Sequence, residues 1–185
     1  AFKCGPDYID PLFHSEIIGA RSRSLDLFFL SEETARYLLE RGGREAGLAL
    51  IEGAMGYYDG VAMSSRASAY HLARATQTPA VLVADGRGSA LTAAAVIQGL
   101  KNFRADSGIR GVIFNRVSPM LYPRLKACVE EETGLRVYGY LPNLPGCTLK
   151  SRHLGLVTAG EVADLKEKLQ ALAAQAEQTI DLDGL

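Results

Sequence analysis

Short apolar runs alternate with longer segments of helical period along the chain, and this alternation limits the fold more than any other feature of the sequence. Each run is bounded by Gly, Pro or Asp, as buried strands are, and the segments between the runs favour helices. Strands joined by crossover helices form a parallel sheet with helices on both faces. The pattern therefore predicts an α/β fold with a mostly parallel sheet.

The runs and periodic segments locate the expected elements. The predicted strands are 1–4, 48–51, 80–84, 109–114 and 136–140, with a weaker candidate at 25–30, and the predicted helices are 31–41, 65–75, 89–103, 119–133 and 160–179. Ser31 is the expected N-cap of the first helix, and Gly42-Gly43 is its expected stop. The last helix carries apolar residues at helical spacing and should be packed: Val162, Leu165, Leu169, Leu172 and Ala173.

Composition limits both the domain number and the class of partner. A chain of 185 residues with 48% apolar side chains can bury one core, so we expect one domain over 1–180 and a tail or linker start at 181–185. A net charge of −1 argues against nucleic acid and membrane partners and favours small molecules or proteins. Three widely spaced cysteines, without an apolar span or a signal peptide, favour reduced thiols and the cytoplasm.

Two loops at predicted strand ends carry carboxylates, and ligands of open α/β sheets bind at such ends. Asp7 and Asp10 are close enough in sequence to face one cation or metal-bound phosphate, with capping of a turn as the alternative. Glu52 follows an apolar run and precedes several glycines and Asp59. An acid at the tip of a buried strand is where phosphate-handling α/β proteins hold magnesium; a Gly-rich turn with a solvated Glu52 is the alternative.

Two further loops carry polar side chains with weaker indications. Asn115 ends a strand and can offer both a donor and an acceptor to a purine edge, with turn formation before Ser118-Pro119 as the alternative. Arg152 and His153 lie in a connection punctuated by Gly and Pro. They suit an anionic ligand, with a solvated loop as the alternative.

Three long motifs, in this order, resemble the cobyrinic acid a,c-diamide synthases. They read Phe2-Lys3-Cys4-Gly5-Pro6-Asp7-Tyr8-Ile9-Asp10-Pro11 with His14, then Glu52-Gly53-Ala54-Met55-Gly56-Tyr57-Tyr58-Asp59-Gly60, then Arg152-His153-Leu154-Gly155-Leu156. The resemblance recurs at Ser64-Ser65 and Asp85 and covers the chain from Lys3 to about Val157. It implies a P-loop NTPase-like fold similar to that of dethiobiotin synthetases.

The resemblance also implies an ATP- and glutamine-dependent amide ligase of cobalamin biosynthesis. In such enzymes ATP phosphorylates the a and c side-chain carboxylates of a corrinoid, and ammonia from a C-terminal glutaminase domain displaces the phosphate. Carried onto this sequence, Lys3 would neutralise charge on the transferring phosphoryl group, and Glu52 and Asp7 would be ligands of Mg²⁺.

The remaining roles also follow from the resemblance. Asp7 and Asp10 would bind metal or orient the acyl phosphate and the incoming ammonia. Asp59 would help to position the corrinoid or the intermediate, and Asn115 would contact adenine. Tyr57 and Tyr58 could shield the activated intermediate from water, with a packed aromatic pair as the alternative.

The first motif stands at residue 1, so the first strand and phosphate loop that precede it in this family lie outside the sequence, as does the glutaminase domain. We therefore expect the chain alone to be inactive and to bind ATP weakly. Without that strand, sheet edges should be left unpaired, so we expect either a sheet that closes up or a homodimer.

Three alternatives stay open. A sister amidating enzyme would act on hydrogenobyrinic acid or nickel-sirohydrochlorin through the same site residues. A dethiobiotin synthetase shares the fold, although the first and third motifs argue against it. A non-catalytic nucleotide-sensing or scaffold protein would tolerate loss of the Glu52 charge, whereas an amide ligase would not.

Overall fold

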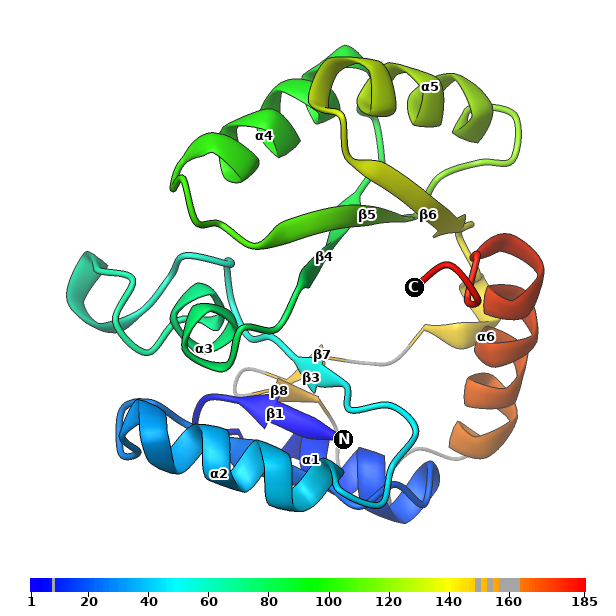
Figure 1. The fold of residues 1–185 in the computed structure, drawn as a ribbon. Coiled ribbons are helices and arrows are strands. Elements are labelled where there is room, and N and C mark those ends of the chain that lie inside the picture. The colour runs from blue at the N-terminus through cyan, green and yellow to red at the C-terminus, as the bar shows by residue number, and fades with distance from the viewer. Residues whose placement is uncertain (8, 149–150, 153–154, 157–163) are drawn as a thin grey trace. The chain divides into compact units, whose positions relative to one another are not determined.

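A computed structural model of the chain describes residues 1–7, 9–148, 151–152, 155–156 and 164–185, with the backbone alone at 151–152 and 155–156. The chain divides into two compact units (Figure 1). Unit 1 holds residues 1–78 and 149–163, and unit 2 holds 79–148 and 164–185. Each contains a three-stranded parallel sheet flanked by helices, which confirms the predicted α/β class.

β1 (Phe2–Cys4) is the central strand of unit 1, with β2 (Arg23–Leu25) and β3 (Ile51–Glu52) parallel to it on either side. α1 (Ile9–Leu12) and the π-helix η1 (Phe13–Ile17) connect β1 to β2, and α2 (Glu32–Gly43) connects β2 to β3. The 3₁₀ helix η2 (Val61–Met63) and α3 (Ala69–Thr76) follow. β7 (Ser151–Arg152) and β8 (Gly155–Leu156) form an antiparallel hairpin.

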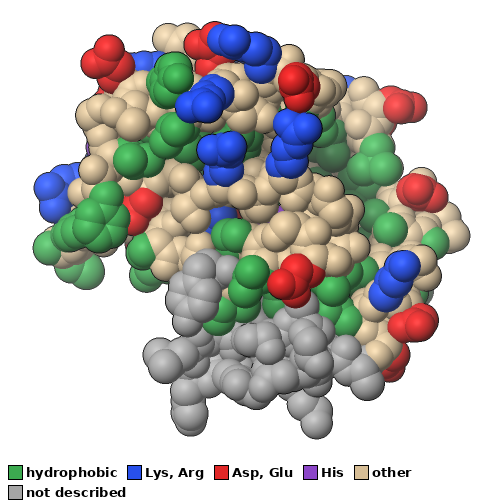
Figure 2. Space-filling model, turned by 90° about the horizontal axis from the view of Figure 1, so that it is seen from below, with side chains coloured by type: hydrophobic (Ala, Val, Ile, Leu, Met, Phe, Trp, Pro, Cys, Tyr) green, Lys and Arg blue, Asp and Glu red, His purple; other side chains and the backbone are tan. Residues whose placement is uncertain are grey.

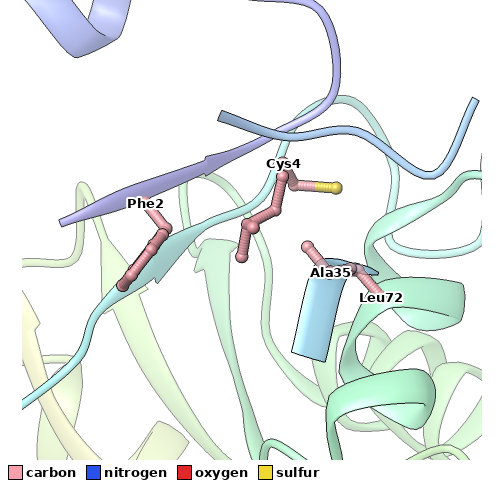
Figure 3. Close-up of a cluster of buried hydrophobic side chains, with 5 residues drawn as sticks. Phe2, Cys4, Ala35 and Leu72 are labelled. Atoms are coloured by element: carbon pink, nitrogen blue, oxygen red, sulfur yellow. The ribbon is translucent and has the colours of Figure 1, made fainter. Parts of the chain in front are cut away.

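The core of unit 1 lies between its sheet and two helices. Apolar side chains from β1, β2, α2 and α3 are buried against one another there: Phe2, Cys4, Leu25, Ala35 and Leu72 (Figure 3). Successive side chains of a strand point to opposite faces, so Phe2 and Cys4 face this core while Lys3, between them, points away from it. The buried Lys3 must therefore find its partners on the other side of the sheet.

Unit 2 has the strand order β4-β5-β6, with β4 (Ala80–Asp85), β5 (Ile109–Asn115) and β6 (Arg136–Leu141). α4 (Leu91–Asn102) and α5 (Tyr122–Thr133) lie together over one face of this sheet (Figure 1). The 3₁₀ helix η3 (Pro145–Cys147) and α6 (Leu165–Thr179) complete the unit. Ile180, which caps α6, bridges to Gly139, and the Asp181 amide donates to Tyr138 O at 2.7 Å, so residue 181 is fixed to β6.

Four predicted strands, those at 1–4, 80–84, 109–114 and 136–140, agree with the structure to within a residue at each end. The strand predicted at 48–51 is wrong at its start, since only Ile51–Glu52 pair and Leu48 and Leu50 are 79% and 65% exposed. The candidate at 25–30 is also wrong. Its strand is Arg23–Leu25, and the Asp26 carboxylate then accepts the Phe28 amide and turns the chain toward α2.

The positions of the helices agree with the prediction better than their ends do. Ser31 caps α2 as predicted, accepting the Thr34 amide at 3.1 Å, and the helix ends at Gly43, within the predicted Gly42-Gly43 stop and two residues beyond the predicted end at 41. Gly42 is needed there for another reason: a Cβ on it would lie 2.8 Å from the Phe2 ring. The other described helices begin two to five residues later than predicted, α3 after the N-cap Ser68, and residues 160–163 lie outside the described chain.

The described strands form a separate parallel sheet within each unit, and the closed-up sheet expected from the sequence stays a prediction. β3 pairs with β1, and β4 pairs with β5. Pairing between two copies of the chain stays a prediction, as do the single domain at 1–180 and the tail at 181–185. Within the described part of the chain, no helix is long and apolar enough to cross a membrane.

Burial within unit 2 gives a first testable expectation. Val112 of β5 is 0% exposed, whereas Val83 of β4 is 71% exposed. Val112→Ala should lower the free energy of unfolding by about 2 kcal/mol, because it removes buried methyl groups and leaves a cavity. Val83→Ala, the matched control, should change it by no more than about 0.5 kcal/mol. Urea unfolding followed by circular dichroism measures both, and equal losses would contradict the assigned burial.

The Cys4 thiol gives a second. Burial, reinforced by the charge of Asp26, raises the pKa of Cys4 to about 11. At pH 8, well below that value, Cys4 is protonated and shielded, so iodoacetamide should leave it unmodified in the folded chain and alkylate it in urea. Peptide mass mapping of both samples reads the result. Alkylation of Cys4 at the same rate in both would show that β1 is not buried.

Candidate functional site

The Lys3 ammonium lies at the centre of a cluster of carboxylates in unit 1. Its Nζ donates to Asp10 Oδ2 at 2.6 Å, to Glu52 Oε1 at 3.0 Å and to the Gly53 carbonyl at 3.3 Å, and it lies 3.7 Å from Asp7 Oδ2. The Lys3 side chain is 4% exposed. The structure thus brings together four of the residues that the sequence suggested for catalysis and metal binding.

Local folding explains this convergence. β1 and β3 are in parallel register with Lys3 opposite Glu52, so the two side chains emerge next to each other. Asp7 Oδ1 accepts the amides of Ile9 and Asp10 at 2.9 and 3.3 Å and so fixes the start of α1. Asp7 therefore caps this turn, and the same turn directs Asp10 toward Lys3. Metal binding by Asp7 stays a prediction.

The cluster contains more acidic groups than basic ones around Lys3. Burial disfavours the Lys3 ammonium, but its hydrogen bonds to Asp10 and Glu52 and the charges of these acids outweigh that cost and raise the pKa of Lys3. Three carboxylates lie within 4 Å of the single Lys3 ammonium, so among these four side chains the acids are in excess. An environment of this kind favours an additional cation.

The donor chemistry also fits magnesium. Among the described residues, no three His, Cys, Asp or Glu side chains are grouped so that they could hold a metal ion. A magnesium site for phosphoryl transfer does not need three such side chains. Mg²⁺ in phosphoryl-transfer sites takes one or two protein carboxylates and completes its shell with phosphate oxygens and water. Glu52 and Asp7 are the residues of this cluster that would hold it.

Two residues without an assigned role extend the cluster. His14 Nε2 lies 2.8 Å from Glu52 Oε2, and His14 Nδ1 lies 3.0 Å from Ser22 Oγ. The sequence marked His14 only as part of the first motif and did not mark Ser22 at all. Ser22 lies in the segment after the π-helix, where no periodic pattern of residues indicates which way a side chain points. Its place beside His14 therefore depends on the folded backbone.

Asp59 is exposed in the loop that follows β3, and the side-chain contacts described around Lys3 do not include it. A Cβ on Gly56 would lie 2.2 Å from Asp59 Oδ2, so the carboxylate occupies the space that this glycine leaves free. Met55, Ala62, Met63 and Ala67 of the same loop region have positive φ. Such strained backbone concentrates at functional sites.

The aromatic residues of this loop pack together. The ring centroids of Tyr57 and Tyr58 lie 4.9 Å apart with an interplanar angle of 70°, and Tyr58 lies 5.0 Å from Tyr70 of α3. The interpretation of Tyr57 and Tyr58 as a packed aromatic pair is confirmed. Their part in shielding an intermediate from water stays a prediction.

Asn115 lies in unit 2, at the end of β5, opposite Asp85 of β4. A hydrogen bond from Arg116, aided by the Arg87 amide, lowers the pKa of Asp85 and keeps it ionised. The contact of Asn115 with adenine stays a prediction. Of the fourth loop, His153 lies outside the described residues and Arg152 is described by its backbone in β7.

The surface carries charges of both signs. Acidic and basic side chains are interspersed with apolar ones on the face shown in Figure 2. This distribution accords with 20 basic and 21 acidic residues in the sequence.

Comparison with known proteins gives the chain its place. A family model described as an AAA domain matches residues 33–151. The chain is 45% identical over 172 residues to the cobyrinate a,c-diamide synthase of Thermoplasma acidophilum. The aligned stretch covers 92% of this chain and 39% of that protein. It is 41% identical to the enzyme of the same name from Clostridium acetobutylicum and 40% identical to that of Clostridium tetani, over all of this chain and 42% and 41% of those proteins.

The chain thus spans about two fifths of the length of the curated relatives that it matches. No solved structure matches it at a significant level. The match to the family model covers more than half of the chain, and the relatives at about 40% identity carry the name that the three motifs suggested. The resemblance to the cobyrinic acid a,c-diamide synthases is therefore confirmed, and the chain belongs to the AAA domain family with its P-loop NTPase-like fold.

Proposed function

We propose that this chain is part of the ATP-dependent region of a cobyrinate a,c-diamide synthase, which activates corrinoid side-chain carboxylates for amidation. The observation that carries the proposal is the Lys3 ammonium held between Asp10 and Glu52 at the carboxyl ends of two adjoining parallel strands. Ligands of parallel sheets bind at this edge. The names of the relatives support the corrinoid as the substrate.

The reaction requires two displacements. A corrinoid carboxylate oxygen attacks the terminal phosphorus of ATP, the bond to the leaving phosphate oxygen breaks, and ADP departs. Ammonia then attacks the acyl carbon, and inorganic phosphate leaves as the amide forms. Such phosphoryl transfer depends on positioning and on positive charge at the phosphate oxygens, more than on covalent chemistry by the protein.

The residues of the cluster suit these needs. Lys3 supplies a positive charge that the neighbouring carboxylates now bind. It would exchange part of its hydrogen bonds to these carboxylates for hydrogen bonds to the transferring phosphoryl group. Glu52 and Asp7 would hold Mg²⁺, which adds positive charge at the phosphates when bound. Asp10 would orient the acyl phosphate and the incoming ammonia, and Asp59 would position the corrinoid.

Parts outside this cluster complete the proposal. Asn115 would select adenine, and a glutaminase domain of the parent protein would release ammonia from glutamine. We further propose that the parent protein works in the cytoplasm. Incubation of the full-length protein with cobyrinic acid, ATP and glutamine, with products followed by liquid chromatography and mass spectrometry, tests the activity, and absence of amidated corrinoid would overturn it.

The charge of Glu52 should be required for turnover. Glu52→Gln in the full-length protein removes a proposed magnesium ligand and should lower kcat at least about 100-fold, the scale of losing one electrostatic contact in a transition state. Glu45→Gln is the control, because Glu45 is 78% exposed and pairs with the equally exposed Arg21. Full amidation by Glu52→Gln, with Glu45→Gln also active, would show that Glu52 is not a required magnesium ligand.

Gly56 should matter through Asp59. Gly56→Ala places a methyl group 2.2 Å from Asp59 Oδ2 and should displace the carboxylate without unfolding the loop. We expect kcat to fall about tenfold and Tm to stay unchanged. Gly47→Ala, with no atom within 4 Å of the added carbon, is the control.

A double-mutant cycle decides whether the effect passes through Asp59. If it does, Gly56→Ala combined with Asp59→Asn should be no slower than Asp59→Asn alone. Additive losses of kcat would contradict the coupling between the two residues.

A further inference from the structure

The imidazole of His14 is held at both nitrogens. Nε2 lies 2.8 Å from Glu52 Oε2, and Nδ1 lies 3.0 Å from Ser22 Oγ. The side chain is 14% exposed. Residues from η1, from the segment before β2 and from β3 thus meet in one chain of hydrogen bonds.

The backbone around His14 holds the ring in place. Phe13, its neighbour in η1, is buried at 8% exposure. The His14 carbonyl accepts the Ala20 amide at 2.9 Å, which closes a loop that ends two residues before Ser22. The ring therefore stands on a fixed segment before any ligand binds.

The proton positions follow from the partners. A carboxylate only accepts hydrogen bonds, so Nε2 must carry the proton that it shares with Glu52. Ser22 can donate to a bare Nδ1 or accept from a protonated one. In either state the hydroxyl holds the ring so that Nε2 faces Glu52, as partners of the second nitrogen do for functional histidines.

The two oxygens of Glu52 have separate partners. Oε1 accepts from Lys3 at 3.0 Å, and Oε2 faces His14. The Glu52 side chain is 44% exposed, so water alone could solvate its charge. The histidine is therefore not needed to bury Glu52, and what it adds is a fixed orientation.

We propose that His14 is a positioning residue for the phosphoryl-transfer step: it holds Glu52 in place through Oε2 when Lys3 turns from the carboxylates to the phosphoryl group, and Ser22 fixes the ring. This inference rests on the proposed function. Loss of a partner that orients a ligand residue in this way costs 10- to 100-fold in related settings. The same scale applies here to kcat or to the Mg²⁺ concentration at half-maximal rate.

Four variants of the full-length protein test the proposal. His14→Ala should lower kcat, or raise the half-saturating Mg²⁺ concentration, about 10- to 100-fold, with the KM for the corrinoid unchanged. His14→Gln, whose amide nitrogen can replace Nε2 as a donor, should recover most of the loss. Ser22→Ala should cost a few-fold by the same reasoning, and Ser22→Thr, which keeps the hydroxyl, should match the wild type.

A readout without turnover accompanies the kinetics. In protein labelled with ¹⁵N-histidine, and with His14 assigned from His14→Gln, the Nε2 resonance of His14 should be that of a protonated nitrogen at neutral pH. It should shift in Glu52→Gln. A bare Nε2 would overturn the proposal whatever the activity shows, because no hydrogen bond to Glu52 could then exist.

The kinetic arm can also overturn it. Wild-type kcat and Mg²⁺ dependence in His14→Ala would do so, as would His14→Gln no better than His14→Ala when both keep the wild-type Tm. If His14→Ala does not fold, Ser22→Ala against Ser22→Thr carries the comparison. Absence of amidation by the wild type would instead overturn the proposed function, and the resonance of Nε2 would still decide the contact with Glu52.

Discussion

A buried ammonium is the constraint on which the site in unit 1 depends. Lys3 stands in a three-residue strand whose members are all buried, with its neighbours Phe2 and Cys4 in the core. A charge taken out of water is tolerated only where it is paired and hydrogen-bonded. The segment after β1 and the tip of β3 supply that pairing, so the position of Lys3 links the packing of the sheet to the arrangement of the acids around it.

The loops that carry the acids could be predicted from the sequence because their signals are local. A strand end followed by Gly-Pro and Asp, or by Glu and several glycines, identifies the edge where ligands bind. Pairing of Lys3 with Glu52 could not be read in this way, since the two residues are 49 positions apart and meet through strand register. The sites of Ser22 beside His14 and of Gly56 beside Asp59 depend on backbone geometry that leaves no periodic pattern.

Element ends were less predictable than element positions, for a related reason. Gly42 and Gly43 end α2 two residues later than predicted, and Gly42 must lack a Cβ because the Phe2 ring occupies that space. The apolar residues Leu48 and Leu50 suggest a strand, yet both side chains are exposed, and although the Leu50 carbonyl accepts the Phe2 amide at 2.8 Å, the register with β1 begins at Ile51. At Gly42 a contact with a residue distant in the sequence thus decides which residue type the position takes. The strand order within each sheet was also not predictable. The pattern of a segment indicates that it forms a strand but not which strand lies next to it.

Each unit is assembled from two separate stretches of the chain, 1–78 with 149–163 and 79–148 with 164–185. The two stretches of unit 2 are separated in the sequence by residues of unit 1. Asp181, in the second stretch, is fixed to β6, in the first, by contacts that span more than forty positions. Any single crossover in a gene exchange within these residues would therefore divide at least one unit between two parents. A single crossover between residues 79 and 163 would divide both units, because the stretches of the two units alternate along the chain.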